Sequence, residues 1–182
     1  MKALACRIMV LFILCMSFID VQALYVPNIL QDSLQAEELY RHGLDAFKAT
    51  DYNTAVRLWK RAAKMGHADA QCNLGSCYFS GMGVSVDYNK ASDWYGKASR
   101  QGHAVAQCNL GNCYLSGKGV ELDLSEAVSW YILSSEQGNV LAITSLGVCY
   151  KQGEGIEENY EKAVECFSRA ANSGYADAQK EL

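Results

Sequence analysis

The sequence predicts an all-α protein in which pairs of antiparallel helices stack on one another. From residue 36 onward the chain is self-similar, and from residue 67 it repeats itself every 36 residues, a period typical of solenoid proteins built from one supersecondary unit. Within each repeat, two segments with apolar residues at helical spacing flank a glycine-containing loop. One such unit cannot bury its apolar face alone, so neighbouring units must stack to form a continuous core.

The domain organisation follows from this period. The predicted segments begin with a leader, a short lead-in and a helix pair that departs from the period. Three complete repeats that align without a gap follow, and a partial repeat covers the apolar end. In residue numbers these segments are 1–23, 24–35, 36–66, 67–102, 103–138, 139–174 and 175–182.

Residues 1–23 predict a cleaved secretory signal peptide. Two basic residues precede an apolar run over residues 8–19. Twelve residues of helix rise about 18 Å, too short for a bilayer core of about 30 Å. Small residues suit cleavage after Ala23, which leaves no membrane anchor on the mature chain. A buried N-terminal helix and an uncleaved anchor are the alternatives.

Thirteen of the fifteen glycines occupy repeat positions. The series that starts at Gly66 follows a helical segment and predicts left-handed C-terminal caps. The series at Gly75 lies inside a helix, where glycine costs about 1 kcal/mol against alanine, so close helix packing must offset it. Gly81 and Gly83 mark the loop between helices. Because no strand precedes this loop, we interpret it as a turn rather than a phosphate-binding loop.

The second helix of each unit is predicted to start after an Asp or Asn that suits the N-cap position. Behind each cap, an alanine, an aromatic residue and a further small residue share one helical face. An aromatic stripe at this spacing is far more often core than a binding site. The caps are Asp51, Asp87, Asp123 and Asn159, and the aromatic residues are Trp59, Tyr95, Tyr131 and Phe167.

Each complete repeat carries a further set of matching residues. In the first copy they are Ala68 to Ala70, Leu74, Gly75, Tyr78, Gly81, Gly83, Val84, Asp87, Lys90, Ala91, Trp94, Tyr95, Lys97 and Ala98. This set resembles the Sel-one-like repeats, relatives of the tetratricopeptide repeat with a longer loop, over residues 68–182. The resemblance implies a right-handed α/α superhelical solenoid. Residues 36–66 have a shorter loop and look like an ordinary tetratricopeptide repeat.

The six cysteines after the leader are interpreted as free, buried, apolar residues. Residues five apart on one helix point about 140° away from each other, and equivalent residues on stacked helices lie about 8 to 10 Å apart. Neither arrangement suits a disulfide. Disulfide bridges, which an even number of cysteines in an exported protein suggests, are the alternative. The residues are Cys72, Cys77, Cys108, Cys113, Cys149 and Cys166.

We expect no enzyme, no cofactor and no metal ion. No SxxK, GxSxG or HExxH motif occurs in the chain. His67 and His103 lie one repeat apart, so no donor set converges on one ion. The cysteine-rich branch of the family implies an alternative, a β-lactamase-like or penicillin-binding hydrolase. This chain has Ser99, Ser135 and Ala171 where that branch places a disulfide cysteine.

We expect the protein to hold a protein or peptide partner in the hollow of the superhelix, which one stripe of each first helix lines. Nucleic acid is not expected, because 16 Lys and Arg face 20 Asp and Glu. The mixed apolar and neutral lining suits a peptide or helix, and packing of these residues against neighbouring helices is the alternative. The predicted groove residues are Tyr40, Leu44, Phe47, Cys72, Ser76, Phe79, Cys108, Asn112, Leu115, Thr144 and Val148.

The predicted signal peptide implies an exported protein. By analogy with exported bacterial relatives, we expect it to be periplasmic or secreted, with the lumen of the eukaryotic secretory pathway as the alternative. The chain end faintly resembles a retrieval signal, but Lys180 stands where that signal has Asp. We therefore interpret the end as the capping helix.

Overall fold

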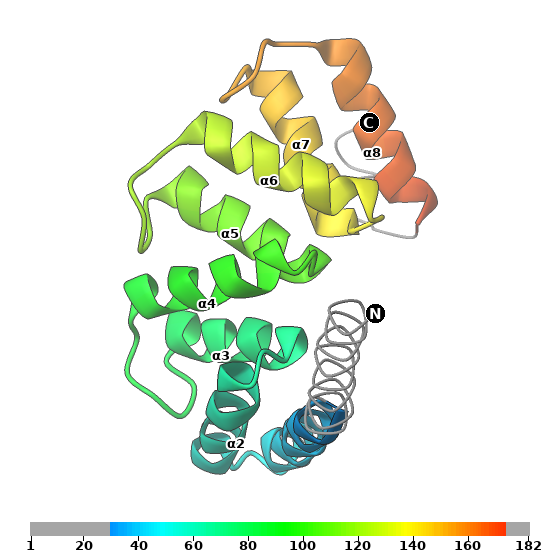
Figure 1. Ribbon diagram of the computed structural model, residues 1–182. Coiled ribbons are helices and arrows are strands. Elements are labelled where there is room, and N and C mark those ends of the chain that lie inside the picture. The colour runs from blue at the N-terminus through cyan, green and yellow to red at the C-terminus, as the bar shows by residue number, and fades with distance from the viewer. Residues whose placement is uncertain (1–29, 174–182) are drawn as a thin grey trace, which may run out of the picture.

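The computed structural model describes residues 30–173, and every regular element in this range is a helix (Figure 1). This confirms the predicted all-α solenoid. The predicted signal peptide and the capping repeat at 175–182 lie outside the described residues. A helix over residues 30–48 comes first. It is followed by α2 (Tyr52–Lys64), α3 (Ala68–Ser80), α4 (Tyr88–Arg100), α5 (Ala104–Ser116), α6 (Leu124–Glu136), α7 (Val140–Gln152) and α8 (Tyr160–Asn172).

The helices pack in chain order, so residues 30–173 form an elongated stack with α8 as its last helix (Figure 1). The most extensive contacts join α3 with α4, α5 with α6 and α7 with α8, the first and second helices of one unit. Contacts of α2 with α3, α4 with α5 and α6 with α7 then join successive units. Each unit therefore depends on its two neighbours, as in other solenoids.

The helices begin at capping residues. Each second helix starts after the predicted Asp or Asn, as at Asp87, whose Oδ1 accepts a hydrogen bond from the Lys90 backbone N–H at 3.0 Å. The glycine after a second helix has left-handed backbone, with φ of 94° at Gly66, as predicted. The first helices have caps that we did not predict. Nδ1 of His67 and of His103 accepts from the backbone N–H three residues on.

The glycine inside each first helix leaves room for the aromatic ring of the second helix. A Cβ atom at Gly75 would lie 2.7 Å from Cδ1 of Tyr95, and one at Gly111 would lie 2.7 Å from Cε1 of Tyr131. Side-chain carbons do not approach so closely. Close helix packing therefore offsets the cost of these glycines, as predicted.

The loop inside each complete unit packs on the second helix of the preceding unit. A Cβ atom at Gly83 would clash with the backbone carbonyl of Tyr52, and one at Gly119 would clash with that of Tyr88. The Ser92 hydroxyl also donates to the Gly119 carbonyl at 2.8 Å. Glycine is therefore needed where the loop approaches the neighbouring backbone.

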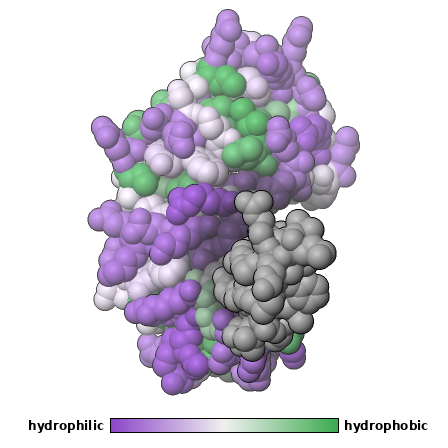
Figure 2. All heavy atoms as spheres, viewed as in Figure 1, coloured by the Kyte–Doolittle hydropathy of each residue, from purple (hydrophilic) through white to green (hydrophobic). Residues whose placement is uncertain are grey.

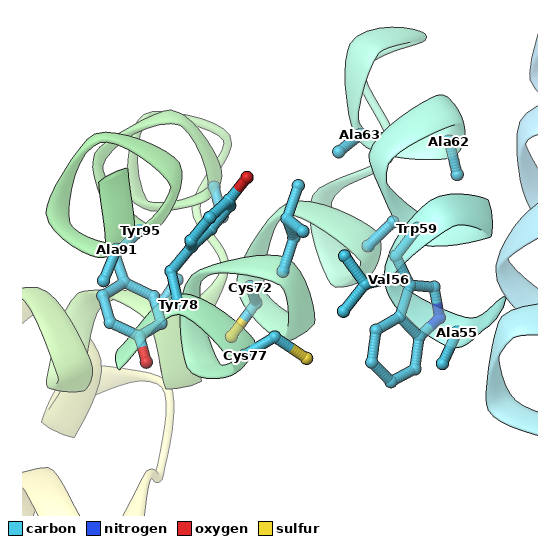
Figure 3. Close-up of a cluster of buried hydrophobic side chains, with 14 of the residues drawn as sticks. Ala55, Val56, Trp59, Ala62, Ala63, Cys72, Cys77, Tyr78, Ala91 and Tyr95 are labelled. Carbon is cyan, nitrogen blue, oxygen red and sulfur yellow. The ribbon is translucent and has the colours of Figure 1, made fainter. Parts of the chain in front are cut away.

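The six cysteines of residues 30–173 are free and buried, as predicted. Cys72 and Cys77 of α3 lie between Trp59 of α2 and Tyr95 of α4 (Figure 3). Burial raises the pKa of Cys77 to about 11. The buried thiols therefore remain protonated at neutral pH and pack as small apolar groups.

Candidate functional site

One side of the first helices is accessible along the stack. On α3, α5 and α7, accessible side chains recur at two repeat positions that carry asparagine, serine or valine. None of these side chains is charged, and all are exposed or half-buried. We call this set the neutral stripe; its members are Asn73, Ser76, Asn109, Asn112, Ser145 and Val148.

Most of the predicted groove residues are accessible in full or in part. Ser76, Asn112 and Val148 belong to the neutral stripe. The remaining predicted groove residues that reach solvent are half-buried between helices. This agrees with the alternative interpretation, in which the apolar residues of the predicted groove pack against neighbouring helices. The half-buried residues are Tyr40, Leu44, Phe47, Phe79, Leu115 and Thr144.

Cys72 and Cys108 do not line an accessible surface, so their prediction as groove residues is wrong. Their exposed fractions are 3% and 2%, whereas the next residues, Asn73 and Asn109, are half-buried. One residue turns a helix by about 100°. Because each first helix packs against its own partner and against the neighbouring unit, only a narrow strip stays accessible. An error of one residue is enough to move a side chain into the core.

Two buried phenols support the neutral stripe from behind. The Tyr95 hydroxyl donates to Ser76 Oγ at 3.2 Å, and the Tyr131 hydroxyl donates to Asn112 Oδ1 at 2.7 Å. Burial raises the pKa of both Tyr95 and Tyr131, so both phenols stay protonated as donors. The Asn112 side chain is thereby oriented, and its NH₂ group remains available to donate.

The aromatic residues proposed for the groove make structural contacts. Phe47 lies edge-on to Tyr52, with ring centroids 5.1 Å apart, and packs on Trp59 at 5.3 Å. Phe79 lies edge-on to Tyr88 at 5.1 Å, with the Lys118 ammonium 5.3 Å from the Phe79 ring centroid. These rings therefore help to join the two helices of each unit.

A cavity of about 230 Å³ opens between the helix over 30–48, α2 and α3. It contains three of the predicted groove residues and four others that the sequence analysis did not assign to a site. The lining residues are Leu44, Phe47, Trp59, Asn73, Ser76, Cys77 and Met82. Because Asn73 and Ser76 also belong to the neutral stripe, the cavity opens directly beside it.

The two capping histidines connect successive first helices. His67 Nε2 lies 2.9 Å from Glu37 Oε2, and His103 Nε2 lies 3.1 Å from Asp69 Oδ1. Since Nδ1 of each ring accepts a backbone N–H, Nε2 carries the hydrogen and donates to the carboxylate. Both ring nitrogens of each histidine therefore form hydrogen bonds that stabilise the fold. Within residues 30–173, no group of three His, Cys, Asp or Glu side chains is placed to hold a metal ion.

Exposed apolar side chains elsewhere are scattered. Val86 and Leu122 lie in the loops, and Leu133 lies on α6. In the view of Figure 2, hydrophobic patches are interspersed with hydrophilic ones over the upper part of the stack. Single apolar residues of this kind are normal on soluble proteins and define no site.

The stacked helix pairs with an accessible neutral stripe define a tetratricopeptide-like helical repeat protein. Within this class the chain belongs to the Sel1 repeat family, whose model matches residues 36–67, 68–103, 104–139 and 140–175. The match includes the first unit, although its loop is shorter than the loops of the other units. Sel1 repeats are typically scaffolds for protein–protein interaction.

Solved structures of two bacterial proteins are similar to this chain. A protective antigen of uropathogenic Escherichia coli with an SLR fold is 34% identical, with a TM-score of 0.76 over 84% of this chain and 34% of that one. A Sel1 repeat protein from Oxalobacter formigenes is 32% identical, with a TM-score of 0.75 over 79% of this chain and 60% of that one.

Among curated proteins, an uncharacterized protein of Neisseria meningitidis serogroup B is 40% identical over 57 residues. The aligned part is 28% of this chain and 12% of the relative. The chain thus spans 34% of the Escherichia coli protein, 60% of the Oxalobacter formigenes protein and 12% of the Neisseria meningitidis protein.

Proposed function

We propose that this Sel1 repeat protein is a non-catalytic scaffold that holds a segment of another protein along the neutral stripe. The observation that carries the proposal is the row of accessible, uncharged side chains on three successive first helices, beside an apolar cavity. A partner segment placed there meets hydrogen-bonding groups and apolar surface without an opposing charge. This combination suits a peptide main chain with neutral side chains.

Asn109 shows what the stripe offers to a partner. Its half-buried side-chain amide forms no hydrogen bond with another residue of the described range 30–173. An amide has two N–H donors and one carbonyl acceptor, which match the C=O and N–H groups of a peptide main chain. Asn112 adds a second amide, held in place by Tyr131.

A peptide library displayed on phage tests this proposal. Peptides selected on the purified chain should bind at least tenfold more weakly to Asn109→Arg, because the long charged side chain covers the stripe. Ser129→Arg is the matched control, since Ser129 is exposed on the second helix α6. Equal affinity for the two variants, or a library that yields no binder, would contradict the proposal.

The absence of catalysis is part of the proposal. Sel1 repeat proteins are generally non-catalytic scaffolds. The ring nitrogens of His67 and His103 are held in hydrogen bonds that stabilise the fold, so neither ring is free to act as a base. Turnover of nitrocefin by the pure protein would contradict this and favour the β-lactamase-like alternative.

We further propose that the protein is exported and that residues 1–23 are removed on the way. Sel1 repeat homologues are often periplasmic or secreted, and the basic start and apolar run of residues 1–23 support a signal peptide. None of the helices in residues 30–173 has the length and apolar character that a bilayer crossing requires. The intact mass of the exported protein should correspond to a start at Leu24. A mass that retains residues 1–23 would disprove cleavage.

A further inference from the structure

We propose that the cavity between the helix over 30–48, α2 and α3 receives one uncharged apolar side chain of the partner segment. This inference rests on the proposed function, because the segment on the neutral stripe supplies the side chain. The cavity would then fix the register of that segment on the scaffold.

The cavity is built by three helices and one loop. Leu44 and Phe47 come from the helix over 30–48, Trp59 from α2, and Met82 from the loop after α3. The Trp59 indole and the Cys77 side chain lie near one another in the buried cluster (Figure 3), and both line the cavity. Trp59 Nε1 donates to the Tyr40 backbone carbonyl at 3.2 Å. The indole N–H is therefore satisfied, and the Trp59 ring, which is only 2% exposed, forms the inner wall of the cavity.

The size of the cavity suits a single side chain. Its volume is about 230 Å³. An engineered protein cavity that binds benzene has a smaller volume, about 150 Å³. The cavity between these helices is smaller than the about 300 to 1,000 Å³ of typical small-molecule sites. A leucine, methionine or phenylalanine side chain fits this range, whereas a complete cofactor or drug-sized ligand does not.

The charge of the cavity excludes an ionised group. None of the seven lining residues is charged, and the Cys77 thiol stays protonated because burial raises its pKa. A charged side chain would enter without a counter-ion, and burying an unpaired charge is strongly unfavourable. The lining therefore selects an apolar occupant.

One unit further along, a charged residue stands at the repeat position of Met82. Lys118 occupies the loop position that Met82 occupies at the cavity, and its ammonium lies 5.3 Å from the Phe79 ring and 5.2 Å from the Tyr88 ring. An apolar residue at this loop position is therefore present where the first two units meet and absent where the next two meet. This difference within one chain supplies matched variants for a test.

Two polar residues connect the cavity to the neutral stripe. Asn73 and Ser76 line the cavity wall and are also members of the stripe. A segment that forms hydrogen bonds along the neutral stripe would therefore pass directly beside the cavity, and one of its side chains would enter it.

Toluene, which has the apolar ring of a phenylalanine side chain, is the first probe. In the full chain with ¹³C-labelled methionine methyls, toluene should shift the Met82 signal saturably. The Met65 signal is the internal control, because Met65 follows α2 and lines a separate hollow that contains the polar residues Asp32 and His67, and it should stay in place. Benzylammonium, of similar size but charged, should leave both signals unchanged. Absence of a saturable Met82 shift would overturn the inference.

Substitutions then test the location. Leu44→Trp should fill the cavity and weaken toluene binding at least tenfold, whereas Val148→Trp, at the same repeat position on α7, should not. Met82→Lys copies the loop residue of the next unit and should also weaken binding, with Lys118→Met as its control. Toluene binding that survives both Leu44→Trp and Met82→Lys in folded protein would overturn the inference.

Peptides selected on the wild-type chain separate this inference from the proposed function. Each peptide should contain one apolar residue whose change to alanine weakens binding to the wild type and has little further effect on binding to Leu44→Trp. If peptides bind the stripe and Leu44→Trp does not weaken them, the cavity inference fails and the scaffold function stands. If no peptide binds, both proposals fail, even where toluene occupies the cavity.

Discussion

At the scale of single residues, the pairing of helices depends on one aromatic ring and the glycine beneath it. The Tyr131 ring is fully buried, and its hydroxyl donates to Asn112. A side chain at Gly111 would have to displace this ring or the Ala127 carbonyl, which lies 3.2 Å from an added Cβ atom. The ring cannot move outward without breaking its hydrogen bond, so the close approach is required.

The change Gly111→Ala should therefore destabilise the protein although alanine is the better helix former. Overpacking of a core typically costs about 1 to 3 kcal/mol, against a propensity gain of about 1 kcal/mol. Gly96→Ala is the control. Gly96 also lies inside a helix, but the nearest atom to an added Cβ is the Arg100 guanidinium at 3.5 Å. Urea denaturation should show a loss for Gly111→Ala and a gain of up to about 1 kcal/mol for Gly96→Ala. A gain for both would show that the ring yields easily.

The buried thiols predict a loss of stability at alkaline pH. Burial raises the pKa of Cys77, Cys108, Cys113 and Cys149 from 9.0 to about 11. A raised pKa in the folded state contributes stability below the unfolded value, and this contribution is lost as the pH rises. The free energy of unfolding should therefore fall between about pH 9 and pH 11. In Cys113→Ala the fall should be less steep. Urea denaturation across this range measures both, and an unchanged slope in the variant would contradict the thiol contribution.

At the scale of elements, buried glutamines join successive units. Gln71 Nε2 donates to the Ala63 carbonyl at 3.0 Å, while Gln71 Oε1 accepts from Gln101 Nε2 at 2.7 Å. One unit on, Gln107 donates to a backbone carbonyl at the equivalent position and accepts from Gln137 at 2.7 Å. A carbonyl in the last turn of one second helix is thus linked to the start of the next first helix.

The last complete unit satisfies the same carbonyl in another way. Ile143 stands where the glutamines stand and has no side-chain donor. The Arg169 guanidinium of α8 instead donates to the Ser135 carbonyl at 3.3 Å. This carbonyl also accepts from the Gly138 N–H at 3.0 Å, so the arginine is an additional donor where the other units use glutamine.

The change Gln107→Leu should remove this link at the middle interface. The Ser99 carbonyl keeps its hydrogen bond from the Gly102 N–H, and Gln137 is exposed. The variant therefore loses two side-chain hydrogen bonds, each worth about 0.5 to 1.5 kcal/mol. Ile143→Leu, the same new residue at the equivalent position, should cost less because one apolar residue replaces another. Thermal denaturation of both variants measures the difference. Equal melting temperatures would mean that the glutamine link adds little.

Features that depend on neighbouring residues were predictable from the sequence, whereas features that depend on contacts between units were not. The caps of the second helices and the role of Gly75 were predictable because they depend on neighbouring residues or on the helix period. The accessible strip was misplaced at Cys72, because it depends on how units rotate against each other. The cavity lining by Met82 was not predictable from its own repeat, since Met82 contacts the preceding unit. Histidine caps such as His67 were missed because histidine is an unusual N-cap residue.

At the scale of the whole molecule, the core consists of two clusters of buried side chains that meet at α5. One cluster extends from the helix over 30–48 to α5, and the other extends from α5 to α8. Helix α5 contributes Leu110 and Cys113 to the first and Cys108 to the second. In such a stack, stability is a sum of unit and nearest-neighbour contributions. A defect at one end is therefore expected to act locally.

The change Phe167→Ala tests this locality. Phe167 joins α8 to α7, where a Cβ atom at Gly147 would lie 2.8 Å from its Cε1 atom, and aromatic core truncations cost about 3 to 5 kcal/mol. In hydrogen exchange followed by mass spectrometry, α7 and α8 should lose protection while α2 to α4 keep theirs. Tyr131→Ala, in the central unit, should instead reduce protection in the neighbouring units on both sides, because α5 belongs to both clusters. If Phe167→Ala lowers protection equally from α2 to α8, the stack unfolds as one cooperative unit and the nearest-neighbour description does not apply.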